Sequence, residues 1–332
     1  MNGLPAISIV IPAYRAEATL PAALEALSQS DFSDFECIVA DDHSPEPAEQ
    51  LGQPGLPVRW VRLDRQGGAA LARNAGAREA RAGLLVFLDA DVTVHPDTLG
   101  RIADALGGQP DLAAIIGSYD DEPAAPDFLS QYRNLMHCFF HRTARPRATT
   151  FWTGCGAVRR DWFLRLGGFD PAFDGIEDIE FGYRLYHAGA RIALDPAIQV
   201  KHHKVWRPWN LLRTDVLSRA VPWTDLILRD RHVPTDLNTS PRQRVSVVLV
   251  WLAPVLLFAG PPAAAAALAA ALLLNLEVLG FFRRKRGLWF GVRAAPWFLF
   301  YLFYSGLGFA LGLARHIRKR VSKTRAASHS PE

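Results

Sequence analysis

The chain has 332 residues and a formal net charge of +4, enough for one large domain or two ordinary ones. Its three cysteines, Cys37, Cys138 and Cys155, show no C-x-x-C spacing, so neither a disulfide framework nor a zinc site is expected, and the chain is typical of a reducing compartment. The N-terminus has no basic region and only a short apolar run, so no secretory signal is expected. Residues after Asp236 carry a charge balance of +11, whereas residues 1–236 carry −7. This asymmetry disfavours nucleic acid as a partner and favours a soluble head on a membrane-bound tail.

The first 120 residues alternate between short apolar runs and helical patterns. Strands are predicted at 7–11, 35–40, 58–61, 84–88 and 113–117. Helices are predicted between them at 20–29, 67–82 and 96–106, the second of which opens on two glycines. Such alternation with short connections predicts an α/β fold with a mostly parallel sheet and helices on both faces.

The pattern is looser from residue 118 to residue 205. Helices are predicted at 128–141, 159–166 and 177–187, and short strands at 191–194 and 197–200. An apolar run with two glycines, FWTGCGAV, occupies 151–158. The first domain is therefore expected to end near residue 205.

Acidic residues directly follow two of the predicted strands. Asp41 and Asp42 follow the strand at 35–40, and Asp89 and Asp91 follow the strand at 84–88. Open α/β sheets bind ligands at this edge, and two oxygen donors there can hold a divalent ion that also binds phosphate oxygens. Taken alone, each pair is also compatible with an ordinary solvated turn.

Seven sequence blocks together resemble the family 2 glycosyltransferases across residues 7–204. In order, the blocks are ISIVIPAY (7–14), ADDHS (40–44), GGAALARNAG (67–76), FLDADV (87–92), GCGAVRR (154–160), GGFD (167–170) and EDIEFGYRL (177–185). The resemblance implies a GT-A fold (Rossmann-like), a nucleotide-sugar donor such as a UDP- or GDP-sugar, and Mg²⁺ or Mn²⁺ as cofactor. His43 stands where the family usually has glycine, which weakens the turn argument for that block alone.

The resemblance also implies roles for individual residues. The donor-side candidates are Pro12, Tyr14, Asp41, Asp42, Arg73 and Asp89, with the acidic pair at 41–42 contacting the nucleoside. The metal candidates are Asp91, Asp89 and His202, although neighbouring His203 leaves the histidine register open. The acceptor-side candidates are Trp152, Gly154, Cys155, Glu177 and Arg184.

The implied catalytic base is Asp178. Displacing a nucleoside diphosphate requires stabilisation of the leaving phosphates and removal of a proton from the attacking hydroxyl. Attack opposite the leaving group inverts the anomeric carbon, and one carboxylate suffices for it. At the start of a helix the dipole is expected to keep Asp178 ionised, but Asp178 could equally be a helix N-cap.

Three other candidates keep a structural alternative. Arg73 can neutralise a phosphate or pair with the acidic sheet edge. Arg184 can contact a phosphate or pair with Glu180 one helical turn earlier. The aromatic face of Trp152 suits a sugar or isoprenoid surface, but a buried tryptophan is the commoner case.

The C-terminal part is predicted to be membrane-associated. Tryptophans and arginines on amphipathic helices at 206–240 suit a membrane interface, with an ordinary surface helix as the alternative. Apolar runs at 245–259 and 263–279 are flanked by basic residues and read as a transmembrane hairpin, 245–280, with both ends cytoplasmic. A third apolar segment, 294–314, completes an anchor at 241–320 and can cross, re-enter or lie in the interface. A disordered basic tail is expected at 321–332.

These patterns predict an inverting, metal-dependent glycosyltransferase that is a multi-pass protein of the inner (plasma) membrane, with a cytoplasmic catalytic domain. Its expected acceptor is a lipid-linked glycan or a polyprenyl phosphate in cell-envelope glycan synthesis, and Asp178 favours a sugar hydroxyl. The alternatives are a processive polysaccharide synthase, whose usual Gln-x-x-Arg-Trp motif is absent after His203, and a catalytically silent nucleotide-sugar-binding scaffold.

Overall fold

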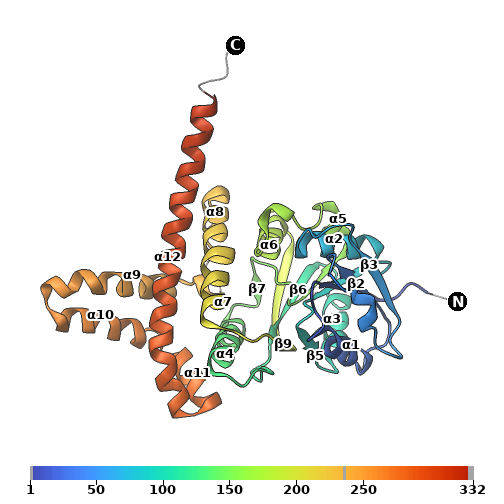
Figure 1. The fold of residues 1–332 in the computed structure, drawn as a ribbon, viewed down its shortest axis with the longest axis horizontal. Coiled ribbons are helices and arrows are strands. Elements are labelled where there is room, and N and C mark those ends of the chain that lie inside the picture. Colours follow the sequence, from blue (N-terminus) through green and yellow to red (C-terminus); the bar gives the residue numbers. More distant parts are fainter. Residues whose placement is uncertain (1–2, 235–236, 328–332) are drawn as a thin grey trace. The chain divides into compact units, whose positions relative to one another are not determined.

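The computed structural model describes residues 3–234 and 237–327. The chain divides into two compact units, Met1–Val205 and Trp206–Glu332, whose elements are labelled in Figure 1. Each unit has its own packing and is described by itself.

The first unit is built on a mixed sheet. Its strands are β1 (Ile7–Ala13), β2 (Phe35–Asp41), β3 (Val58–Arg62), β4 (Leu84–Leu88), β5 (Val92–Val94), β6 (Leu112–Tyr119), β7 (Arg147–Ala148), β8 (Cys155–Arg159) and β9 (Arg191–His202). The strand order is β3-β2-β1-β4-β8-β6-β9-β5, and β7 pairs with β9. The parallel arrangement expected from the sequence is found in β3-β2-β1-β4 and in β6–β9, whereas β8, β5 and β7 pair antiparallel.

One strand replaces the two short strands expected at 191–194 and 197–200. β9 runs unbroken from Arg191 to His202, but its register against β6 shifts between Leu194 and Gln199. A Cβ on Gly117 would lie 2.4 Å from the carbonyl oxygen of Ile198, so the two backbones approach closely at the irregularity. The shift, rather than a chain break, accommodates the proline between the two predicted strands.

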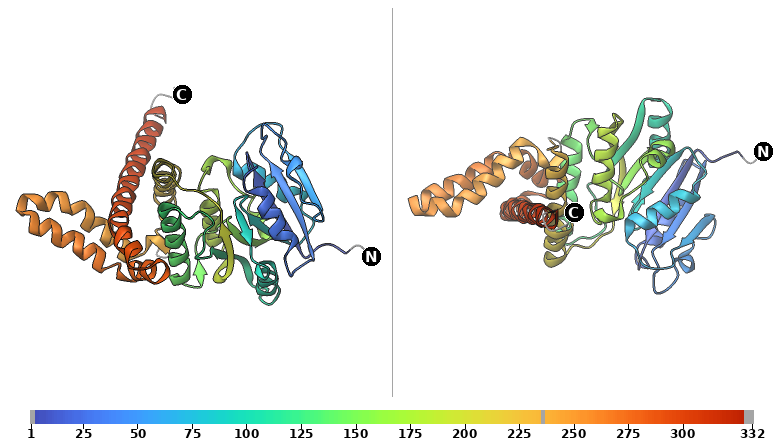
Figure 2. Two further views of the ribbon diagram at one scale, coloured as in Figure 1. Left: turned by 60° about the horizontal axis from the view of Figure 1, so that its bottom comes forward. Right: turned by 90° about the horizontal axis from the view of Figure 1, so that it is seen from above.

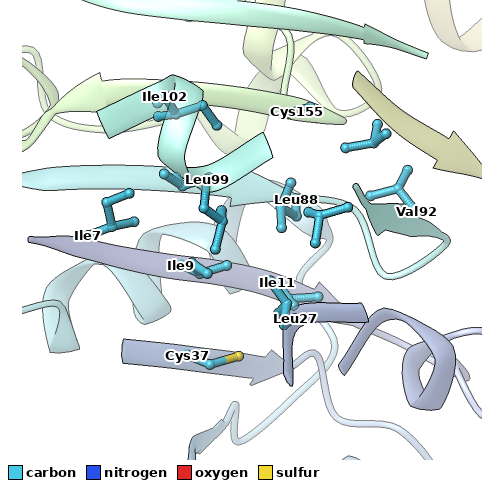
Figure 3. Close-up of a cluster of buried hydrophobic side chains, with 14 of the residues drawn as sticks. Ile7, Ile9, Ile11, Leu27, Cys37, Leu88, Val92, Leu99, Ile102 and Cys155 are labelled. Carbon is cyan, nitrogen blue, oxygen red and sulfur yellow. The ribbon is translucent and has the colours of Figure 1, made fainter. Parts of the chain in front are cut away.

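Helices cover both faces of the parallel half of the sheet. The helices of this unit are α1 (Leu20–Ser28), α2 (Ala69–Glu79), α3 (Thr98–Gly107), α4 (Phe128–Thr143), α5 (Arg160–Arg165) and α6 (Glu177–His187), with short turns η1 (Ala48–Leu51) and η2 (Pro171–Phe173). Alternate residues of β1 point to opposite faces: Ile9 lies in the cluster with α1 and α3 in Figure 3, whereas Val10 meets Gly76 of α2.

A second apolar layer forms beside β4 and positions α6. Its rings, packed within 6.4 Å of one another, are Phe87, Phe151, Phe163, Phe169 and Phe181. A Cβ on Gly182 would lie 2.2 Å from the backbone nitrogen of Phe151. The absence of a side chain at Gly182 therefore lets α6 pack directly on that backbone, which fixes the position of its N-terminus.

The second unit is entirely helical among its described residues. Its elements are α7 (Pro208–Leu212), the π-helical segment η3 (Arg213–Ala220), α8 (Val221–Asp230), η4 (Leu237–Thr239), α9 (Pro241–Leu256), η5 (Leu257–Ala259), α10 (Pro261–Leu273), α11 (Leu276–Arg286) and α12 (Leu288–Ala327). By length and composition, Pro241–Ala259 and Leu288–Arg320 could each cross a membrane.

Two expectations about this unit need correction, and the alternatives for the third apolar segment stay open. The apolar run at 263–279 is not one helix, because α10 and α11 meet at a 65° bend. The third apolar segment lies inside a helix of 40 residues. The tail expected to be disordered from 321 is helical as far as Ala327, and its last five residues lie outside the described part of the chain.

Buried polar side chains join α9 to the break between α10 and α11. Asn275 donates to the hydroxyl of Ser246 at 2.8 Å and accepts from the amide of Gln243 at 2.6 Å, and all three side chains are buried. At the same end, Arg242 pairs with Glu277 at 2.8 Å. These contacts close the open end of the α9–α10 hairpin.

Candidate active site

The acidic residues predicted at strand ends share one edge of the sheet. β1, β2 and β4 are parallel neighbours, so their carboxyl ends meet there, as is usual for ligand sites of open sheets. Pro12 lies near the end of β1 and is half-buried, and Tyr14, just beyond it, is 39% exposed. Both predicted donor-side residues of β1 are therefore accessible at this edge.

Asp41 and Asp42 hold the loops around this edge in place. Asp41 accepts hydrogen bonds from the backbone N–H groups of Ser44 (2.9 Å) and Ala48 (3.3 Å) and pairs with Arg62 at 2.8 Å. Asp42 accepts from the backbone N–H groups of Gly67 and Gly68 at 2.7 and 2.9 Å. Both carboxylates are thus satisfied by the chain itself, and direct contact with a nucleoside stays a prediction for each.

Gly68 makes the second of these contacts possible. It precedes α2 with φ +87°, a conformation that side chains rarely adopt. The resulting turn points two successive N–H groups at Asp42. The glycine pair at 67–68 therefore ties the start of α2 to the end of β2.

Arg73 lies on α2 and joins two acidic groups. Its guanidinium donates to Asp89 at 2.6 Å and to Glu177 at 2.5 Å, and only 4% of the residue is exposed. Burial lowers the pKa of Arg73, but the negative charges of Asp89, Glu177 and Asp178 raise it above its usual value. Of the two roles considered for Arg73, pairing with the acidic sheet edge is present in the structure.

Asp178 lies in the first turn of α6, beside Glu177. One of its oxygens accepts from the N–H of Ile179 at 2.8 Å, and the other lies 3.2 Å from the backbone nitrogen and 3.3 Å from the hydroxyl of Thr153. The helix begins at Glu177 with Ile176 at its N-cap, so the alternative role of Asp178 as the cap is not realised.

The pKa of Asp178 is raised to about 6. Burial is the main cause and the charge of Glu177 adds to it, while Arg73 and the backbone N–H groups of Thr153 and Ile179 oppose the rise. The N–H groups at the helix N-terminus favour the ionised form, as expected from the sequence, but they do not cancel the effect of burial. A carboxylate with a pKa near neutrality, still partly accessible, is suited to accept a proton.

His202, rather than His203, faces Asp91. The Nε2 atom of His202 lies 3.8 Å from a carboxylate oxygen of Asp91, whereas Nε2 of His203 lies 3.0 Å from the hydroxyl of Thr93. The ring of His202 is stacked on Tyr119 with centroids 4.1 Å apart. Successive side chains along an extended chain point to opposite faces, so only one of the two imidazole rings can face the carboxylate of Asp91.

Asp91 and His202 could together hold a divalent ion. Burial raises the pKa of Asp91, but His202 and Lys204 lower it below the usual value, so the carboxylate is ionised. Within the described part of the chain, no group of three or more His, Cys, Asp or Glu side chains is placed to bind a metal. The donor set fits Mg²⁺ or Mn²⁺, which commonly take one or two protein ligands and complete their shell with phosphate and water.

Two acceptor-side expectations need correction. Cys155 is fully buried in the core, as Figure 3 shows, and burial raises the pKa of its thiol to about 12, so it cannot meet an acceptor. Arg184 pairs with Glu180 at 2.7 Å and donates to the carbonyls of Leu166 and Gly168. Its guanidinium is occupied in joining α6 to the turn after α5, and so it has a structural role.

The remaining acceptor-side residues lie next to the site or in contact with it. Trp152 covers Gly154, where a Cβ would lie 2.3 Å from the indole. The edge of Trp152 meets Tyr119 with ring centroids 4.9 Å apart, and Tyr119 in turn supports His202. Glu177 reaches the site through Arg73.

Sequence reasoning missed Tyr119 and Thr153. Tyr119 ends β6, so the same strand-end argument that selected the aspartates could have found it. Thr153 follows Trp152 in a loop, and no pattern in the sequence indicates that it would contact Asp178. Asn74, which follows Arg73 on α2, donates to and accepts from the backbone of Phe169 at 2.7 and 2.9 Å.

Comparison with known proteins agrees with this geometry. Residues 8–167 match the family model "Glycosyl transferase family 2". An uncharacterised glycosyltransferase of Haemophilus influenzae is 29% identical over 190 residues, which cover 54% of this chain and 61% of that protein. Validoxylamine A glucosyltransferase of Streptomyces hygroscopicus subsp. limoneus is 30% identical over 221 residues, covering 56% of this chain and 49% of that protein. The chain thus spans about half to three-fifths of these relatives.

Solved structures show the same fold at low sequence identity. The mannosyltransferase PcManGT of Pyrobaculum calidifontis, solved with GDP-Man and Mn²⁺, has a TM-score of 0.59 at 21% identity and matches 93% of this chain and 88% of its own. GalNAc-T7, solved with UDP, GalNAc and Mn²⁺, has a TM-score of 0.51 at 18% identity over 75% of this chain and 51% of its own. The fold is of GT-A type, and the match over residues 8–167 identifies a glycosyltransferase family 2 domain in the chain.

Proposed function

We propose that this protein transfers a sugar from a UDP- or GDP-sugar, with Mg²⁺ or Mn²⁺, to a membrane-associated acceptor, and that the anomeric carbon is inverted. The observation that carries the proposal is the connection of Asp89, Arg73, Glu177 and Asp178 at one sheet edge. Asp89 pairs with Arg73, which pairs with Glu177 beside Asp178. The proposed donor-binding carboxylate, Asp89, and the candidate base, Asp178, are thus connected through Arg73 and Glu177.

In this proposal the diphosphate of the donor lies at Asp89 and Asp91. Asp91 and His202 would hold the divalent ion, which neutralises negative charge on the leaving diphosphate when bound. Tyr119 holds the ring of His202 towards Asp91. Support for the metal also comes from the two similar structures, both of which contain Mn²⁺.

Asp178 would accept the proton of the acceptor hydroxyl. The hydroxyl oxygen bonds to the anomeric carbon as the bond to the diphosphate oxygen breaks, and the proton passes to the carboxylate. Its pKa of about 6 keeps most of the carboxylate ionised at neutral pH, while it remains basic enough to assist. A phosphate acceptor would need little such assistance, so we propose a sugar hydroxyl on a lipid-linked glycan ahead of a polyprenyl phosphate.

The membrane location of the acceptor is supported by the second unit. Two of its described helices are long and apolar enough to cross a bilayer, and basic residues flank the apolar runs. One relative, the O-antigen biosynthesis protein RfbC of Myxococcus xanthus, has a name that refers to cell-surface glycan synthesis. We therefore propose that the enzyme works in cell-envelope glycan synthesis, with its catalytic unit on the cytoplasmic side of the inner membrane.

The test is a panel of UDP- and GDP-sugars with Mn²⁺ and the native lipid extract as acceptor, measuring nucleotide release and sugar incorporation. We expect one donor to be used, and Asp178→Asn to lower turnover by about 10²- to 10⁴-fold, the usual range for loss of a general base. Asp161→Asn on α5 is the matched control, because that carboxylate is 62% exposed and pairs only with Arg165 in the structure. Full turnover in Asp178→Asn would exclude the base assignment. A donor that binds without turnover in the wild type would instead indicate a silent scaffold.

A further inference from the structure

Beyond Arg244, the α9–α10 hairpin is an outward-facing apolar element. No charged residue occurs between Arg244 and Glu277. Large side chains on both arms and at the tip are exposed, among them Val255 at 60%, Phe258 at 96% and Leu273 at 64%. Only 22% of the most apolar window of the first arm is buried within the chain. Such a surface requires an apolar environment.

The hairpin does not run alongside α12. In Figure 1, α12 stands upright while α9 and α10 extend sideways from it; in the right panel of Figure 2, α12 is seen nearly end-on while the hairpin is seen along its length. The two elements therefore cannot both run parallel to the bilayer normal. If one of them enters the membrane along the normal, the other lies along the membrane surface.

The hairpin and the α7–η3–α8 helix occupy nearly opposite faces of α12. On one face, a Cβ on Gly306 would lie 2.2 Å from the indole of Trp251 in α9. On the other, a Cβ on Gly308 would lie 2.4 Å from the side chain of Ala220 in η3. Two residues along an α-helix correspond to a rotation of about 200°. Whichever way the hairpin points, α8 therefore lies on the far side of α12.

A crossing α12 would place charged groups in the hydrocarbon. Its charge-free stretch, 294–314, is centred on Tyr304, whose hydroxyl donates to Asp215 of η3 at 2.9 Å. Asp215 pairs in turn with Arg219 at 3.6 Å, and the side chain of Arg219 is 43% exposed. The middle of the bilayer would then contain an aspartate and an arginine open to lipid, an unfavourable position for both.

We propose that the α9–α10 hairpin enters the membrane from one face and returns to it, and that α12 lies along that same face. In this arrangement none of the described helices crosses the bilayer, in contrast to the multi-pass anchor expected from the sequence. The partner surface is the lipid bilayer, with acyl chains around the hairpin and anionic headgroups at its base. The proposal concerns the anchor alone and does not depend on the sugar, the acceptor or the reaction.

The length and the tip of the hairpin agree with a re-entrant element. α10 has 13 residues and is therefore about 20 Å long, shorter than the hydrocarbon core of about 30 Å. The tip carries Pro261 and Pro262, which have no N–H group, in the first turn of α10. Fewer unsatisfied donors are thus exposed where the tip would meet acyl chains.

Charges and exposed apolar groups agree with a surface position for α12. Basic residues flank the hairpin in the chain, where headgroups would lie: Arg242 and Arg244 in the first turn of α9, and Arg283, Arg284, Lys285 and Arg286 in the last turn of α11. Among the exposed apolar side chains of α12, Trp289, Val292, Phe300 and Phe303 share one side at helical spacing, and a helix on the membrane surface can present such a side to lipid.

Cysteine labelling with a membrane-impermeant maleimide, in right-side-out and inverted membrane vesicles, tests this arrangement. Three single substitutions each report one place in the anchor. Phe258→Cys reports the tip of the hairpin, Arg284→Cys the end of α11, and Ser322→Cys the far end of α12. All three native cysteines are buried, so the unsubstituted full-length protein gives the background. We expect Arg284→Cys and Ser322→Cys to label from the same face, and Phe258→Cys to label from neither until detergent dissolves the membrane.

A second measurement separates insertion from misfolding. A bimane fluorophore on Phe258→Cys should be quenched at least twofold more by a deep doxyl-labelled lipid than by a headgroup-labelled one, and the reverse is expected on Ser322→Cys. Phe258 is almost fully exposed, so the substitution removes little packing. Labelling of Ser322→Cys from the face opposite to Arg284→Cys, or labelling of Phe258→Cys from either face of intact vesicles, would overturn the proposal.

Discussion

Replacing Glu177 by glutamine should make Asp178 more acidic without displacing it. Glutamine has nearly the same shape as glutamate and can still accept the hydrogen bond from Arg73, which is 2.5 Å long in the structure. The substitution removes one of the two causes that raise the pKa of Asp178, the charge of Glu177. Arg73 would then pair with one negative charge fewer, and its positive charge would lower the pKa of Asp178 more strongly.

The size of the effect is bounded by the structure. The pKa of Asp178 is raised from 3.8 to about 6, with burial as the larger cause. Since burial remains in the variant, the pKa should fall by about one unit, equivalent to about 1.4 kcal/mol of interaction between the two carboxylates. A base works only when ionised, so activity is present above its pKa and is lost as the pH falls through it.

The assay is kcat/KM between pH 5 and pH 8.5 at saturating Mn²⁺. In the wild type we expect kcat/KM to fall on the acid side of the pH profile with a midpoint near pH 6. In Glu177→Gln we expect this acid limb to have its midpoint about one pH unit lower. Glu180→Gln is the matched control, because Glu180 is a buried acid on the same helix that pairs with Arg184 rather than Arg73. A limb that stays in place in Glu177→Gln, or moves to higher pH, would refute the assignment of the limb to Asp178.

Three further outcomes can be checked. Asp91→Asn should raise the Mn²⁺ concentration for half-maximal activity at least about tenfold, measured by titrating metal into EDTA-treated enzyme; an unchanged value would remove Asp91 from the metal site. Gly76→Ala should destabilise the first unit by about 1–3 kcal/mol, because its Cβ would lie 2.6 Å from Val10, whereas Gly100→Ala, with nothing within 4 Å, should be neutral or stabilising in the same thermal melt. Arg184→Ala should lower the melting temperature, at a cost of about 2–4 kcal/mol, and leave the acceptor KM unchanged; a raised acceptor KM would return Arg184 to the site.

The positions of the candidate groups along the chain could be predicted because they follow from periodicity and strand ends. A short apolar run bounded by polar residues, such as 84–88, favours a buried strand, and the residues that follow such a strand emerge at the carboxyl edge. The strand that precedes Asp89 and Asp91 could therefore be predicted without tertiary information.

The pairing of the groups could not be predicted, because it depends on contacts between distant segments. Arg73 and Glu177 are 104 positions apart, and nothing local distinguishes an arginine that binds phosphate from one that binds a carboxylate. The same holds for Cys155, which lies between a glycine pair in sequence but faces the core because β8 pairs in register with β4. Burial of this kind is decided by the partner strand.

The anchor shows the limit of hydropathy. Composition identified the apolar stretches, including 294–314, but hydropathy does not indicate how the apolar helices are oriented relative to one another. Only the packing of Gly306 and Gly308 against different helices shows that α12 has a hairpin on one side and a charged helix on the other.

The buried polar contacts at the open end of the hairpin have a consequence for biosynthesis. Gln243 and Ser246 belong to α9, and their buried contacts with Asn275 need a residue that is made about 30 positions later. In the proposed anchor these contacts lie at the membrane surface, so residue 275 must be translated before the open end of the hairpin can be closed. The contacts therefore favour insertion of the two arms as a pair.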